Sequence, residues 1–183
     1  MLCTERVVKR LFVACVLLLA TAQAPHAEEI APPLKSVAVM EFELIDDMRE
    51  FESAEVLDAE THRLSLISEE LRHELDQRAL YHVLDNAPAA DLIAHFKALQ
   101  ELRECNGCEV EIGKALGADV VIVGWVQKVS NLILNINLKA RDVHTGATLY
   151  AHSVDLRSNN DTSWLRGIHY IVNGLAEDQE HLR

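Results

Sequence analysis

Two cysteines separated by two residues, Cys105 and Cys108, carry the clearest candidate chemistry in this sequence. A CxxC pair can exchange thiols and disulfides when the amino end of a following helix stabilises a thiolate. Exchange sites of this kind place the first cysteine at the start of a helix directly after a strand, whereas here a helix is predicted before the pair. Asn106 and Gly107 supply the flexible turn that so small a ring requires. The spacing therefore predicts a structural disulfide, with thiol–disulfide exchange as the alternative.

Nine histidines and an acidic segment, residues 45–60, are the candidate metal ligands. His144 and His152 lie near two aspartates on strands that are predicted to pair, but a shared site would need one particular register. The acidic segment lacks the alternating aspartates and central glycine of an EF-hand loop. The two cysteines have no second Cys or His pair close by, as a zinc site would require. We therefore predict no metal and no cofactor.

Charge and motif content restrict the classes of function. The sequence has no G-x-S-x-G elbow, no P-loop and no G-x-G-x-x-G fingerprint. It has 17 basic and 29 acidic residues, which gives a formal net charge of −12. Nucleic acids and anionic membrane surfaces are bound by clustered lysine and arginine, so this balance argues against both. We predict a non-catalytic protein that binds no nucleic acid.

The first 22 residues have the pattern of an export signal. Arg6, Lys9 and Arg10 precede a short apolar run, residues 11–20, which small residues follow. The run is roughly half the ~20 residues needed to span a bilayer, so we predict cleavage and no stable membrane insertion afterwards. Cleavage is predicted after Ala22, because a proline disfavours the later small-residue sites. The expected location is the periplasm, where the remaining cysteine pair would oxidise.

Hydrophobic periodicity outlines the elements that must position these residues. With 49% hydrophobic residues the chain can bury a core. Strands are predicted where apolar residues alternate or cluster, and helices where they recur every three or four positions. The predicted strands are residues 36–44, 81–85, 119–129, 132–143 and 148–157. The predicted helices are residues 61–80, 88–102, 109–116 and 161–176, and residues 45–60 are predicted to form an acidic loop.

Alternation assigns faces within two of the strands. In the first strand, Val37 and Val39 are predicted to face one way, while Met40, Phe42 and Leu44 face the other. In the strand over residues 132–143 the apolar side chains point inward. Its outward residues form a candidate docking surface, and the alternative is that they are simply the solvent side of a two-layer sandwich. This candidate surface consists of Asn135, Asn137, Lys139 and Arg141.

Three blocks of sequence, residues 102–108, 116–134 and 160–167, resemble a family of small secreted proteins from Gram-negative bacteria whose function is unknown. The resemblance covers residues 36–172 and implies no catalytic residue. Relatives lie in gene neighbourhoods for quinoprotein alcohol oxidation, so the resemblance implies support of a periplasmic oxidation system. The D-x-x-T-G turn between the later strands also resembles the sheet of TolB amino-terminal and curli-secretion envelope proteins.

The order of elements predicts one α/β sandwich whose mixed sheet has parallel early strands and antiparallel C-terminal strands. Helices between the early strands imply parallel pairing, and hairpin connections imply antiparallel pairing. The predicted organisation is a signal peptide over residues 1–22, an extended leader over 23–35, a single α/β domain over 36–176 and a charged tail over 177–183.

Three functions from different classes remain. The first is a non-catalytic periplasmic accessory or docking module whose partner is another envelope protein. The second is a thiol–disulfide redox protein that uses the CxxC pair. The third is a small-ligand carrier, which would need a deep apolar pocket rimmed by Trp125, Tyr150 or Trp164.

Overall fold

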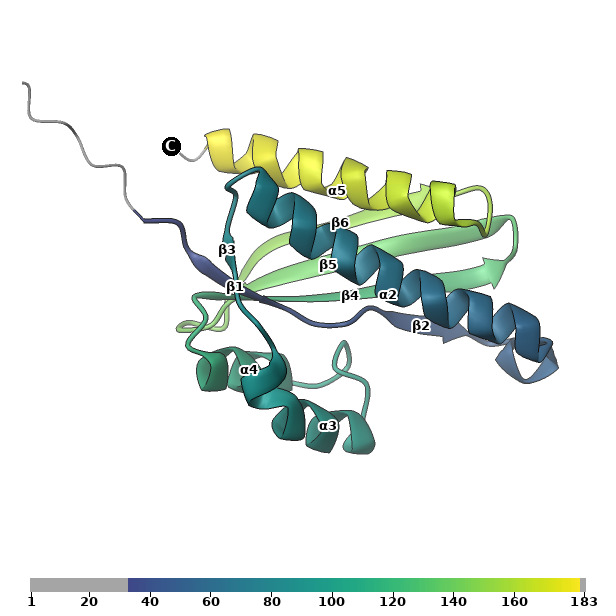
Figure 1. Ribbon diagram of the computed structural model, residues 1–183, viewed down its shortest axis with the longest axis horizontal. Helices are drawn as coiled ribbons and strands as arrows, with labels where there is room; N and C mark the ends of the chain where they lie inside the picture. The colour runs from purple at the N-terminus through teal and green to yellow at the C-terminus, as the bar shows by residue number, and fades with distance from the viewer. Residues whose placement is uncertain (1–32, 182–183) are drawn as a thin grey trace, which may run out of the picture. The chain divides into compact units, whose positions relative to one another are not determined.

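The computed structural model describes residues 33–181 of the chain (Figure 1). The predicted signal peptide, its cleavage point and most of the predicted leader lie outside these residues. The strands are β1 (Ser36–Val39), β2 (Glu43–Asp46), β3 (His82–Val83), β4 (Val120–Ser130), β5 (Ile133–Asp142) and β6 (Thr148–Leu156). The helices are η1 (Arg49–Phe51), α2 (Ala54–Gln77), η2 (Ala87–Ala89), α3 (Ala90–Leu99), α4 (Cys108–Leu116) and α5 (Asp161–His181).

The strands form one mixed sheet in the order β3-β1-β4-β5-β6, with β2 also paired to β4. The pairs β1–β3, β1–β4 and β2–β4 are parallel, and the pairs β4–β5 and β5–β6 are antiparallel. Helical crossovers join the parallel strands, whereas short turns join the antiparallel ones. This arrangement confirms the predicted α/β domain with parallel early strands and antiparallel later strands.

Two groups of helices cover opposite faces of the sheet (Figure 1). Helices α2 and α5 lie side by side over one face, where Ile67, Leu71, Trp164 and Ile168 are buried against β4 and β5. Helices α3 and α4 cover the other face only near β1 and the beginning of β4. Helix α5 continues through the charged residues of the predicted tail as far as His181. One face is therefore covered along most of its length, and the other over a smaller part.

The predicted first strand is interrupted, which corrects the expectation of one strand over residues 36–44. Val39 lies opposite Ile122, and Glu43 lies opposite Trp125. The segment from β1 to β2 therefore advances four residues where β4 advances three. The extra residue reverses the alternation of side chains. As a result Phe42 packs in the same core cluster as Val39, and not on the face of Met40 as predicted.

The segment predicted as an acidic loop, residues 45–60, is also largely ordered. Helix α2 begins at Ala54, and the Oγ atom of Ser53 accepts a hydrogen bond from the backbone N–H of Val56. Glu60, on the first turns of this helix, is fully buried. From the sequence alone, the charge of Glu60 suggests a solvent-exposed position, because its partner Lys128 lies far away along the chain.

Candidate functional site

The partly covered face of the sheet has no helix over the end of β4, the beginning of β5 and the end of β6 (Figure 1). The pairing of these strands places Asn137 of β5 between Trp125 of β4 and Ser153 of β6. Because side chains alternate along each strand, every second residue joins the same surface. We call this surface the open sheet face. It consists of Trp125, Gln127, Asn135, Asn137, Lys139, Ala151, Ser153 and Asp155.

The structure places three of the four predicted docking residues on the open sheet face. The amide nitrogen Nδ2 of Asn137 donates to Oδ1 of Asn135, and Lys139 follows on the same side of β5. All three side chains are half-buried. Their polar groups are thus held in place by the strand while remaining accessible to another surface.

Arg141, the fourth predicted docking residue, has different surroundings. Its guanidinium pairs with the buried carboxylate of Glu109 in α4 and donates to the backbone carbonyl of Gly146. A buried carboxylate without a partner would be costly, so this contact supports the packing of α4 on the sheet. Nothing in the sequence around Arg141 signals this role, because Glu109 belongs to a distant element.

An apolar rim borders the open sheet face at the turn between β4 and β5. Val129, Leu132 and Ile133 are 63%, 70% and 60% exposed. Trp125 lies before this rim along the chain, in the middle of β4, and is half-buried. Exposed apolar residues that gather beside a polar surface are typical of protein contact sites.

The structure joins Cys105 and Cys108 in a disulfide at the start of α4, with 5.6 Å between their Cα atoms. Gly107 between them has a φ of 110°, which only glycine adopts readily. Both cysteines are buried and pack in the core cluster beneath α3 and α4. The bridge closes the turn that leads into α4.

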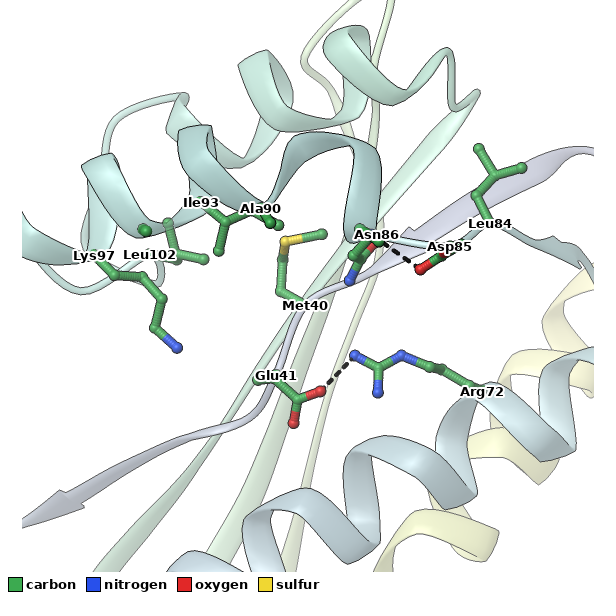
Figure 2. Close-up of a pocket in the computed structure, with 12 residues that line it drawn as sticks. Met40, Glu41, Arg72, Leu84, Asp85, Asn86, Ala90, Ile93, Lys97 and Leu102 are labelled. Carbon is green, nitrogen blue, oxygen red and sulfur yellow. Dashed lines mark hydrogen bonds and ion pairs between the residues drawn. The ribbon is translucent and has the colours of Figure 1, made fainter.

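A pocket of about 550 Å³ opens where β1 and β3 end (Figure 2). Arg72 reaches it from α2 and forms an ion pair with Glu41, with 2.8 Å between NH2 and Oε1. Met40, Ile93 and Leu102 lie on the side of α3. The sequence offered no motif for this pocket, since its lining comes from separate elements.

The three aromatic residues named as a possible pocket rim lie in separate environments. Trp164 is fully buried and its Nε1–H donates to Oδ1 of Asn159. The hydroxyl of Tyr150 donates to the carbonyl of Ile171, and burial raises its pKa to about 12. Both side chains therefore anchor α5, while Trp125 lies on the open sheet face.

The two histidines predicted as candidate metal ligands lie apart, and a second group of possible ligands is internally paired. His144 lies 3.5 Å from Asp119, whereas His152 stacks against Tyr150, so the two predicted histidines do not share a site. Glu70, Glu74 and His169 place ligand atoms within 4.8 Å of one another between α2 and α5. Glu70 pairs with His169, and Glu74 pairs with an arginine one turn along α2.

A buried charged cluster lies between β4 and the start of α2. The ammonium group of Lys128 contacts Asp46, Glu52 and Glu60 at 3.0, 2.7 and 2.7 Å. Burial alone would lower the pKa of Lys128, but hydrogen bonds to the three carboxylates outweigh it and raise the pKa above its usual value. The ammonium therefore stays charged and holds β2, β4 and α2 together.

No helix among residues 33–181 combines the length and the apolar character needed to cross a lipid bilayer. No curated protein matches this sequence.

Several solved structures have a similar fold. The C-terminal domain of LpoB from Salmonella enterica is 12% identical, with 71% of this chain and 87% of that chain covered at a TM-score of 0.47. A lipoprotein from Neisseria meningitidis is 18% identical, with coverages of 78% and 96% and a TM-score of 0.45. TolB from Acinetobacter baumannii is 8% identical, with coverages of 81% and 29% and a TM-score of 0.46. These similarities are too distant to transfer a function.

A family model provides the closer assignment. The model for DUF3280, described as "Protein of unknown function (DUF2380)", matches residues 35–175. This range contains all three sequence blocks that resemble a family of unknown function, and it confirms that resemblance. The chain belongs to the DUF3280 family.

Proposed function

We propose that this protein is a non-catalytic docking module of the cell envelope that binds another envelope protein through the open sheet face. The observation that carries the proposal is the uncovered part of the sheet, where ordered polar side chains lie beside a half-buried tryptophan and an apolar rim. Tryptophan is among the residues that contribute most to binding when a partner covers it.

The charge of this surface favours a protein partner that is not a second copy. The open sheet face carries one cation, Lys139, and one anion, Asp155, in a chain of net charge −12. Its near neutrality allows another protein to approach. Two copies would each bring the full negative charge, and an anionic membrane would repel the chain for the same reason. The partner therefore presents a flat polar surface with apolar groups opposite Val129, Leu132 and Ile133.

Site-specific photocrosslinking tests this proposal. A photoreactive amino acid replaces Ser153 on the open sheet face or, as the matched control, the exposed Ser65 on α2 over the opposite face. In intact cells we expect Ser153 to give an adduct with one other envelope protein, and Ser65 to give none. Trp125→Ala and Lys139→Glu should each weaken that adduct while leaving the melting temperature of the purified protein close to wild type.

Three results would overturn the proposal. They are adducts of equal yield from both positions, an adduct only with a second copy of the chain or with lipid, and no adduct from Ser153. With the purified partner, Trp125→Ala should weaken affinity by at least tenfold, the loss typical of a central aromatic contact. If the affinity of Trp125→Ala is unchanged, the open sheet face is not the surface that binds the partner.

We further propose that the module acts in the periplasm in support of a quinoprotein-type oxidation system, which the family resemblance supports. A strain without the gene should grow more slowly on an alcohol as carbon source and normally on sugars. If the strain without the gene grew as well as wild type on both carbon sources, the partner would belong to another system. The periplasmic protein should begin at Gln23, which intact-mass measurement determines.

The disulfide is proposed to be structural, because both sulfurs are buried beneath α3 and α4. We expect a reduction potential below about −300 mV, as in disulfides that only stabilise a fold. A value near −270 mV or more oxidising, roughly that of thioredoxin, would instead support the thiol–disulfide exchange of Cys105 and Cys108.

A further inference from the structure

The pocket at the ends of β1 and β3 occupies a special position in the topology. The connection that leaves β1 runs through α2 on one face of the sheet, and the connection that leaves β3 runs through α3 and α4 on the other face (Figure 1). Two neighbouring strands whose connections depart in opposite directions leave a crevice at their carboxyl ends. In open α/β sheets, ligands bind in such crevices.

The floor and one wall of the pocket are apolar. Met40 follows β1, Leu84 follows β3, and Ile93 and Leu102 come from α3 and the segment after it. Figure 2 shows Met40 pointing toward Ile93 and Leu102. A volume of about 550 Å³ is within the roughly 300–1,000 Å³ of small-molecule sites. The body of a bound molecule would therefore be apolar.

Two cationic side chains of the pocket keep hydrogen-bond donors free: Lys97 on α3 and Arg72 on the opposite side. Arg72 uses its NH2 group both for Glu41 and for the carbonyl of Val39, so its NH1 and Nε groups remain without a partner within residues 33–181. Lys97 projects from α3 toward the same space and has no ion-pair partner in the described part of the chain (Figure 2). Of the two carboxylates that line the pocket, Glu41 is paired with Arg72 and Asp85 accepts a hydrogen bond from the backbone N–H of Ala87. Within residues 33–181, the free donors of Arg72 and Lys97 are therefore the groups left for an anionic ligand.

We propose that this pocket binds a small carboxylic acid with an apolar body. The apolar part lies against Met40, Ile93 and Leu102, and the carboxylate accepts hydrogen bonds from the Nζ group of Lys97 and the free NH1 group of Arg72. Charged hydrogen bonds of this kind fix both the orientation and the sign of charge of the ligand. The site is distinct from the open sheet face, so a second ligand class is bound independently of the protein partner.

Calorimetric titration with octanoate tests the proposal, with octanol and octylamine as probes of the same length. We expect saturable binding of octanoate and much weaker binding of the neutral and cationic probes. Lys97→Gln should weaken octanoate binding about tenfold, the usual consequence of losing one charged hydrogen bond. The matched control, Lys114→Gln, alters an exposed lysine of α4 outside the pocket and should bind as wild type.

A second variant shows whether octanoate binds in the pocket or is attracted only by the overall charge of the protein. Ala94 lines the pocket, so Ala94→Phe fills it without changing a charge and should abolish binding. NMR should show octanoate shifting the methyl signals of Met40 and Ile93, with those of Val154 unchanged. Absence of saturable octanoate binding, equal affinity for octanol, or unchanged binding by both variants would each overturn the proposal. Crosslinking from Ser153 is independent of these results.

Discussion

At the scale of single residues, the structure is governed by charges that find partners far away in the sequence. Lys128 neutralises part of a cluster of three carboxylates. Arg141 does the same for Glu109 beneath α4. Buried ions stabilise a fold only when they are paired, so each pair commits its elements to one arrangement.

Replacing Lys128 is expected to destabilise the protein strongly. Lys128→Met leaves Asp46, Glu52 and Glu60 facing one another without a cation, and loss of one partner of a buried pair costs about 3–5 kcal/mol. Urea denaturation measures the change in the free energy of unfolding. Lys139→Met, on the open sheet face, is the control and should change stability by less than about 0.5 kcal/mol; an equal loss for both would contradict the role of the cluster.

Asp119 gives the stability a defined dependence on pH. Its carboxylate accepts hydrogen bonds from the backbone N–H and hydroxyl of Ser36, which lower its pKa below the usual value. The folded state therefore binds this proton more weakly than the unfolded state. The stabilisation is present above the unfolded pKa of about 3.9 and is lost as the pH falls through the lower folded value.

Asp119→Asn removes this contribution. We expect the variant to be less stable than wild type at neutral pH, with the difference shrinking as the pH falls below about 4. Urea denaturation at a series of pH values provides the measurement. A stability difference that stays constant over that range would show that the hydrogen bonds to Ser36 do not favour the ionised form.

At the scale of elements, the joint between β1 and β2 decides how the first strand meets the sheet. Phe42 turns into the covered face at this joint, and its backbone N–H donates to the hydroxyl of Ser68 in α2. The ring lies directly over Gly124 of β4, where any Cβ atom would overlap it. A glycine in the middle of the longest strand is thus required by the packing of another element.

Gly124→Ala is expected to destabilise the protein by about 1–3 kcal/mol, the usual cost of overfilling a packed core. Combining it with Phe42→Leu should recover part of that loss, because the smaller side chain makes room for the new methyl group. Thermal and urea unfolding of both single variants and the double variant measure this coupling. Val129→Ala, at an exposed position of the same strand, is the control. If the stability losses of the two single variants simply add in the double variant, the contact with the Phe42 ring is not the source of the strain.

At the scale of the whole molecule, the sheet is covered unequally and the chain carries a large negative charge. Two long helices cover most of one face, whereas the other face has α3 and α4 over a smaller part of its area (Figure 1). The incomplete layer leaves both the open sheet face and the pocket accessible. The net charge of −12 keeps such a surface from driving self-association, but it also places the folded state under repulsion.

Salt is therefore expected to stabilise the protein. Raising the ionic strength from about 0.01 to about 0.15 M shortens the screening length from roughly 30 to 8 Å, which weakens repulsion between exposed carboxylates. The melting temperature should rise over this range, as differential scanning fluorimetry can measure. Glu177→Lys changes the net charge from −12 to −10 and should reduce the effect. A falling melting temperature would show that attractive surface pairs dominate.

Local patterns in the sequence were sufficient for the later strands and most helices. The apolar run of β4, the alternation of β5 and the turn at Gly146 depend on neighbouring residues only, as does the left-handed Gly117 that ends α4. The alternation of side chains, which is also a local pattern, was enough to predict that Asn135 and Asn137 lie on one side of β5.

The tertiary structure alone decided where distant residues meet. The joint at Phe42 exists because Gly124 accommodates the ring, and the early start of α2 is supported by Lys128, 68 positions after Glu60. The pocket likewise combines the ends of two strands with side chains from α2 and α3. Periodicity records which side chains are apolar along one element, but the partner that pairs a buried charge or fills a gap is set by packing between elements.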